Sequence, residues 1–223
     1  FSQQRKIDSL KSVLEKGKED TNRVATLNRL ANTLANTGNL DEAQPYYQES
    51  LDLSTKLNYN FGIAASLNYL GMIYLNKGLF PEALEFFFKS LEVAEKYNIK
   101  KGMAAAMGNI GIIYENEKDY NKALRYHFKS LKIEEELGNL NGVAGSYNSI
   151  GSIYYFKNNS QKAIEYYNKA LEVKRKMGDE EGCASTLANI GNIYYYQKDY
   201  KKTQEYYFMA LPFFEKTNDL QSV

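Results

Sequence analysis

Residues 67–94 read LNYLGMIYLNKGLFPEALEFFFKSLEVA, and their pattern of apolar residues indicates the fold. Its first half places Leu67, Leu70 and Tyr74 three or four residues apart, which is the spacing of one face of an α-helix. Its second half repeats that spacing after a short polar break. The stretch therefore predicts two helices joined by a tight turn, which is an antiparallel helix hairpin.

The same pattern recurs every 40 residues, and five copies keep register without an insertion. Small residues recur at one position of each predicted helix, where we expect the two helices of a hairpin to touch backbone to backbone. A single hairpin cannot bury its apolar side alone, so neighbouring hairpins are expected to stack. The two columns of small residues are Ala31, Gly71, Gly111, Gly151 and Gly191 in the first helix, and Ala43, Ala83, Ala123, Ala163 and Thr203 in the second.

These repeats resemble the tetratricopeptide repeat family, in its long-repeat branch. The residues that carry the resemblance are Leu70, Gly71, Tyr74, Ala83, Phe87 and Ser90, with their equivalents every 40 residues. The family's usual tryptophan and closing proline are missing, and the period is 40 residues where 34 is commonest. The resemblance implies an all-α fold, a right-handed α-solenoid superhelix of antiparallel helix hairpins with a concave inner face.

The predicted organisation follows from the register of the repeats. A capping helix with Ile7, Leu10, Val13 and Leu14 on one face is expected before the array, and a truncated sixth repeat after it, because its residues copy an earlier inter-repeat linker. The segments are 1–23 for the capping helix and linker, 24–57, 64–97, 104–137, 144–177 and 184–217 for the five repeats with six-residue connections, and 218–223 for the start of the sixth.

Composition excludes several classes of protein. The 223 residues carry 28 Lys and Arg against 27 Asp and Glu, and this balance argues against a protein that mainly binds nucleic acid or an anionic membrane. One Cys and one His exclude a disulfide and a multi-histidine metal site. No run of about 18 apolar residues is present, so we expect no membrane insertion.

The sequence shows no catalytic constellation. His127 occupies a column that otherwise holds Tyr47, Phe87, Tyr167 and Tyr207, so we interpret it as a packed filler, with a pH sensor or ligand group as the alternative. Cys183 takes the place of an aliphatic residue and is interpreted as a small buried hydrophobe. We therefore predict no enzyme activity, no cofactor and no metal site.

Polar positions of the first helix of each repeat are the candidate binding site, because the resemblance places these helices along the concave face. An asparagine offers a donor and an acceptor together and can pair with the backbone of an extended peptide. The alternative is that these are ordinary surface residues of an asparagine-rich chain. The aromatic residues of the last two repeats predict a buried anchor there. The candidate residues are Asn28, Asn32, Asn68, Tyr69, Asn109, Asn148, Ser152, Tyr155, Phe156, Asn189, Asn192, Tyr195 and Tyr196.

Three functional hypotheses remain open on the sequence. The first is a non-catalytic scaffold that binds a protein or peptide segment in the concave groove. The second is the N-terminal sensory domain of a bacterial signalling protein, a histidine kinase or nucleotide cyclase. The third is a self-assembly module, a homo-oligomer that forms through the ends of the solenoid. The chain shows no signal segment, and its compartment, cytoplasmic or periplasmic, is left open.

Overall fold

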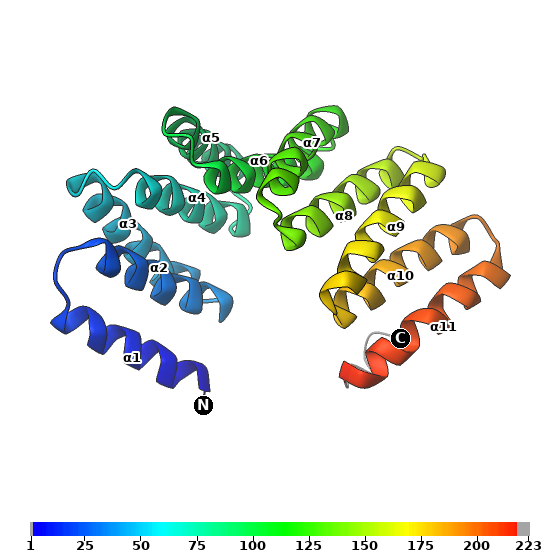
Figure 1. The fold of residues 1–223 in the computed structure, drawn as a ribbon, viewed down its shortest axis with the longest axis horizontal. Helices are drawn as coiled ribbons and strands as arrows, with labels where there is room; N and C mark the ends of the chain where they lie inside the picture. The colour runs from blue at the N-terminus through cyan, green and yellow to red at the C-terminus, as the bar shows by residue number, and fades with distance from the viewer. Residues whose placement is uncertain (1, 218–223) are drawn as a thin grey trace. The chain divides into compact units, whose positions relative to one another are not determined.

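The computed structural model describes residues 2–217, and these residues form an all-α fold (Figure 1). Consecutive helices pack against one another in sequential antiparallel pairs, which confirms the predicted fold class at this level. Over the described residues the helices are α1 (Ser2–Lys16), α2 (Thr21–Asn36), α3 (Leu40–Lys56), α4 (Asn60–Asn76), α5 (Phe80–Lys96), α6 (Lys100–Asn116), α7 (Tyr120–Leu137), α8 (Leu140–Phe156), α9 (Ser160–Met177), α10 (Glu180–Tyr196) and α11 (Tyr200–Thr217).

The chain forms two compact units, the first ending at Ile113 and the second starting at Tyr114, within α6. In the first unit α2 pairs with α3 and α4 with α5, and α3 also packs against α4. In the second unit α8 pairs with α9 and α10 with α11, and α7 packs against α8. Both units therefore show the same local arrangement, in which helices that are adjacent in the sequence pack against each other.

The column of small residues in the first helices has a steric cause that differs from the expected one. A Cβ atom added at Gly71 would lie 2.6 Å from the ring of Phe87, and one added at Gly151 would lie 2.9 Å from the ring of Tyr167. The nearest atoms are therefore those of an aromatic ring on the second helix, and not those of its backbone. The glycine makes room for the ring, which closes the interior of the pair.

A second column of glycines lies where each new pair meets the previous one, at Gly62, Gly102, Gly142 and Gly182. A Cβ atom added at Gly102 would lie 3.1 Å from the Cβ atom of Ala94, while one added at Gly62 would collide with the hydroxyl of Ser54. These glycines lie in the first turn of α4, α6, α8 and α10. At α4, α6 and α8 the glycine lets the beginning of the first helix approach the end of the preceding second helix, whereas Gly182 makes room for the capping Asp179.

The turns between helices follow the chemistry of their residues. Asp119 and Asn159 cap α7 and α9 by accepting a hydrogen bond of 3.1 Å from a backbone N–H of the first turn. The residue type of Asn39 predicts the same cap for α3, but its side chain makes no cap hydrogen bond and its amide donates to the hydroxyl of Thr37. Asn58 and Gly138, among others, end the second helices with positive φ, as their residue types predict.

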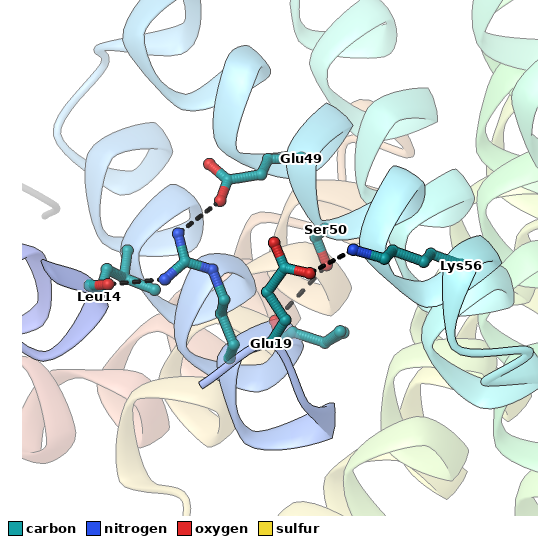
Figure 2. Close-up of polar contacts among 7 residues, drawn as sticks. Leu14, Glu19, Glu49, Ser50 and Lys56 are labelled. Atoms are coloured by element: carbon teal, nitrogen blue, oxygen red, sulfur yellow. Dashed lines mark hydrogen bonds and ion pairs between the residues drawn. The ribbon is translucent and has the colours of Figure 1, made fainter. Parts of the chain in front are cut away.

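Helix α1 packs against α2 and is tied to the first pair by polar contacts (Figure 2). The guanidinium of Arg23 donates to the carbonyl oxygen of Leu14 at 2.6 Å and to the carboxylate of Glu49 at 2.8 Å. Ile7 and Leu10 are buried as expected, whereas Val13 is 52% exposed and the prediction for it is wrong. At 3.6 residues per turn Val13 lies about 60° beyond Leu10 around the helix axis, on the side away from Ile7.

The position of Pro212 within the last predicted helix leads us to expect a kink or a break there, and α11 does not break, because it continues through Pro212. The segment 218–223, expected to begin a sixth repeat, lies outside the described residues. Within 2–217 there is no helix whose length and hydropathy would suit it to spanning a bilayer.

Candidate functional site

The first helix of each pair leaves one stripe of residues uncovered. On α4 this stripe runs through Phe61, Ala65, Tyr69, Met72 and Asn76, at steps of three and four residues. Phe61 is 48% and Met72 38% exposed, although both are large and apolar. We call this stripe and its equivalents on the other first helices the first-helix face.

The predicted asparagine ladder is turned partly inward. Asn28 and Asn68 are only 9% and 8% exposed. Within the first unit the amide of Asn109 donates to the side-chain oxygen of Asn68 at 3.0 Å. The oxygen Oδ1 of Asn28 is buried without a hydrogen-bond partner. Asn28 and Asn68 therefore lie below the surface of the first-helix face, and Asn68 is already bonded to Asn109. The three residues do not form an open row of free amides.

Two asparagines accept hydrogen bonds from tyrosines of the second helix of their own pair. Asn32 accepts from the hydroxyl of Tyr47 at 2.7 Å, and Asn192 accepts from Tyr207 at 2.6 Å. In the first unit the ring of Tyr47 also stacks on Tyr69, with 5.1 Å between ring centroids. These contacts hold Asn32, Tyr69 and Asn192 in fixed positions, which reduces the entropy cost of using them to bind a guest.

The first unit holds a hollow of about 240 Å³ at the beginnings of α4 and α6. Its wall is largely apolar, with the exposed Lys101 at the start of α6. Two predicted residues, Asn68 and Tyr69, belong to it. The full lining is Phe61, Ala64, Ala65, Asn68, Tyr69, Ile99, Lys101, Gly102 and Ala105.

The second unit holds a more open hollow of about 470 Å³ at the ends of α8 and α10. It brings together the predicted Tyr155, Phe156 and Tyr196 with Ile193, and adds the polar Asn158, Ser160 and Gln197. Phe156 and Tyr196 are 53% and 70% exposed. Tyr195 is 53% exposed and meets the edge of Tyr196, but it does not line the hollow. Exposed aromatic area of this kind is common at protein-binding sites.

The remaining predicted residues lie on α8 and α10 of the second unit. Ser152 donates to the carboxylate of Glu115 at 3.1 Å. Asn148 and Asn189 are half-buried on the first-helix face. The structure therefore brings the predicted residues together in small groups within each unit, and these groups are of different chemical character.

His127 lies inside the second unit, beside the carboxylate of Glu115. The imidazole is 3% exposed, its Nε2 atom has no hydrogen-bond partner, and it lies 3.9 Å from the carboxylate of Glu115. Burial lowers the pKa of His127 to about 4 and raises the pKa of Glu115. The imidazole is thus neutral near pH 7, and the interpretation of His127 as a packed core residue is confirmed. Cys183 is likewise buried, at 2% exposure.

A column of small residues on the first-helix face was not among the predicted site residues. The column Ala25, Ala65, Ala105, Gly145 and Ser185 is exposed or half-buried throughout, and two of its members line the hollow of the first unit. Its signal is the same 40-residue period that identified the packing columns. A small residue can leave space for a neighbouring helix or for a guest, and spacing alone does not distinguish the two.

Comparison with known proteins agrees with this architecture. A family model described as tetratricopeptide repeat matches residues 22–96 and 102–176. No curated protein sequence matches the chain. Among solved structures, BtubC from P. vanneervenii is 21% identical, with a TM-score of 0.84 over 98% of this chain and 93% of that one.

Two further structures have the same fold. A Rap protein complexed with Competence and Sporulation Factor is 15% identical, with a TM-score of 0.78 over 95% of this chain and 59% of that one. A signal transduction ATPase with a tetratricopeptide repeat sensor, from Pyrococcus horikoshii, is 20% identical, with a TM-score of 0.79 over 89% of this chain and 30% of that one. At these identities the likeness concerns the fold alone. Because the family model covers most of the described helix pairs, the chain belongs to the tetratricopeptide repeat family.

Proposed function

We propose that this chain is a non-catalytic module that binds an extended peptide or protein segment on its first-helix face. The observation that carries the proposal is that each unit has a hollow on this face, lined in part by exposed residues such as Phe61 in the first unit and Phe156 and Tyr196 in the second. Hollows that are mostly apolar and carry a few fixed polar groups are the usual form of a recognition site.

The two hollows favour different kinds of ligand side chain. The hollow of the first unit is narrow and lined by alanines, with the Asn68 amide on its floor, so it suits one aliphatic side chain and a neighbouring backbone carbonyl or N–H group. The hollow of the second unit is wider and aromatic, so it suits a large apolar or aromatic side chain. Each acts as an anchor site for one side chain of the ligand.

The test starts from a displayed library of random peptides, from which binders are selected on the purified chain. Affinities are then measured by fluorescence anisotropy for the wild type and for two variants. Ala65→Trp fills the hollow of the first unit, and Tyr196→Ala removes a wall of the second. We expect each variant to weaken binding by about tenfold or more, because each removes one anchor.

Glu92→Ala serves as the matched control, because Glu92 is exposed on α5, the second helix of the α4 pair. Its affinity should stay within about twofold of the wild type. Selected peptides whose affinity is unchanged by both Ala65→Trp and Tyr196→Ala would contradict the assignment of the face. A failure to select any peptide would contradict peptide binding itself.

A regulatory role is a second candidate, favoured by the similarity in fold to a Rap protein complexed with a peptide factor and to an ATPase with a repeat sensor. In this role, peptide binding on the first-helix face controls an activity of the whole protein. Assay of the full-length protein with and without a selected peptide tests it. An output that stays the same at saturating peptide would contradict the regulatory role and leave the binding module intact.

A further inference from the structure

Charged residues recur at two positions of the second helices, four residues apart, and we call these positions the charged stripe. They are Glu85 and Lys89 in α5, Arg125 and Lys129 in α7, and Glu165 and Lys169 in α9. In α5 and α9 the glutamate of the stripe pairs with the lysine four residues later. Glu85 bonds Lys89 at 2.6 Å, and Glu165 bonds Lys169 at 2.7 Å. A Glu preceding a Lys by four residues is the favourable order for such a pair on a helix. The stripe is therefore close to neutral at these two places.

Stacked aromatic rings lie beside the stripe in each of these pairs. In the second unit Tyr114 stacks on Tyr126 at 5.7 Å, with Lys122 lying over the first ring at 4.9 Å and Lys129 over the second at 5.6 Å. The equivalent rings Tyr154 and Tyr166 also stack, at 5.5 Å. The rings hold the lysine stems along the helix surface, so the ammonium groups have defined positions.

Helix α7 breaks the pattern. The position that holds Glu85 and Glu165 in the neighbouring repeats holds Arg125. Lys129 therefore lacks the carboxylate that its equivalents have four residues earlier. In the part of the chain that the structure describes, no carboxylate lies within ion-pair distance of either Arg125 or Lys129, while Lys122 pairs with Asp119 at 2.9 Å.

These groups surround a hollow of about 170 Å³, lined by Tyr114, Lys122, Arg125, Tyr126 and Lys129. Lys122, Arg125 and Lys129 follow one another at steps of three and four residues, so they lie along one side of α7. The volume is several times that of one water molecule, which takes about 30 Å³. Two cations without a carboxylate partner thus face a space large enough for a tetrahedral anion.

We propose that this hollow binds a phosphate monoester, carried by a phosphorylated side chain of a partner polypeptide. The charge balance supports this ligand, because Arg125 and Lys129 supply two uncompensated positive charges and a phosphoserine carries about −1.5 to −2 at pH 7. The planar fork of an arginine binds two phosphate oxygens at once, and the lysines add point charges. A single carboxylate would leave one cation unbalanced.

The form of the site favours a polypeptide as the source of the phosphate. The hollow lies along one side of α7, and its lining offers a small free phosphate few groups beyond the cations and the two tyrosines. A single-stranded nucleic acid would need open aromatic faces on which its bases stack. Here one face of each ring is taken by the other ring and one by a lysine.

The experiment uses two fluorescent peptide pools that are randomised around a central residue, phosphoserine in one pool and serine in the other. Their binding to the purified chain is measured by anisotropy, with inorganic phosphate and a 12-base single-stranded oligonucleotide as competitors. The proposal expects binding of the phosphoserine pool to exceed that of the serine pool by about tenfold. Inorganic phosphate should compete only at far higher concentration.

Arg125→Glu is the decisive variant because it restores the charge pattern of the neighbouring repeats. It should abolish the preference for phosphoserine while the thermal midpoint stays the same or rises, since Lys129 regains a carboxylate four residues before it. Arg175→Gln, which removes one cation from an exposed position of α9, is the control and should leave binding within about twofold.

The reciprocal variant Glu165→Arg gives α9 the arrangement of α7, with Lys162, Lys169 and the stacked Tyr154 and Tyr166 already in place. It should raise the number of phosphopeptides bound from one to two. Equal binding of the two pools, an unchanged preference in Arg125→Glu, or a stoichiometry that stays at one in Glu165→Arg would overturn the proposal. So would tighter binding of inorganic phosphate or of the oligonucleotide than of the phosphopeptide.

Discussion

The α4–α5 pair of the first unit and the α8–α9 pair of the second are equivalent segments, 80 residues apart, and they agree in their interiors. In each, a glycine of the first helix makes room for a buried ring of the second, Phe87 in one pair and Tyr167 in the other. The stacked rings beside the interface also agree, with interplanar angles of 12° and 13°. The interior positions thus form a common frame.

The same two pairs differ on the side that no neighbour covers. The first helix α4 opens a hollow near its beginning, where Phe61 and Ala65 lie. Helix α8 has Asn141 and Gly145 at those positions and lines a hollow near its end, through Tyr155 and Phe156. Interior side chains must fit the fixed space between two helices, whereas side chains on the first-helix face are free of that packing constraint and can differ between repeats. The comparison therefore separates packing from recognition, position by position.

The largest expected effect tests the common frame. Gly71→Leu and Gly151→Leu should each lower the free energy of unfolding by about 2 kcal/mol, because a side chain at either position collides with a buried ring. Chemical denaturation followed by circular dichroism measures the loss. Gly145→Ala is the control, because a Cβ atom there meets nothing within 4 Å and alanine favours a helix. A loss at only one of the two glycines would show that the two interiors are not equivalent.

The next effect concerns the buried imidazole of His127, in α7. The pKa of His127 is about 4 in the folded chain, below its ordinary value of 6.5, so the unfolded chain binds more protons between these values. Stability should therefore fall as the pH drops from 7 to 5, by about 2 kcal/mol from this group. The raised pKa of Glu115 acts in the opposite direction and reduces the net change at the acid end.

His127→Phe should remove most of this pH dependence, and it places in α7 the ring that α5 has at the equivalent position. Tyr167→Phe is the matched control, because burial raises the pKa of Tyr167 to about 12 and its hydroxyl does not titrate in acid. Urea denaturation at pH 7, 6 and 5 gives the three slopes. A wild-type slope that persists in His127→Phe would mean that other groups cause it.

The smallest effect tests how closely the two pairs must match. The hydroxyl of Ser90 donates to the carbonyl oxygen of Ala64 at 2.8 Å, whereas α9 has Ala170 at the equivalent position. Ser90→Ala should cost about 1 kcal/mol through loss of this buried hydrogen bond. Thermal melting of Ser90→Ala and of the reciprocal Ala170→Ser compares the two places. No change in Ser90→Ala would show that the hydroxyl adds nothing to the frame.

Much of this fold is predictable from the sequence because the same 40-residue pattern repeats along it. Any one copy of the pattern is weak, but five copies in register identify the helices, the packing columns and the buried role of His127. The candidate site was less predictable. Asn68 and Asn109 were expected to offer their amides to a ligand, yet they bond each other across 41 positions of sequence.

The pairing of the helices and the apolar side of each helix follow from the residue pattern alone, because a period of 3.6 residues assigns every position to a side of its helix. The pairing of polar groups and the location of the hollows follow only from how the helices pack together. Those outcomes depend on distances between neighbouring helices, and a spacing along one helix does not contain them. The ring that fills the space beside Gly71 and the hollow that opens beside Ala65 both arise from contacts between helices.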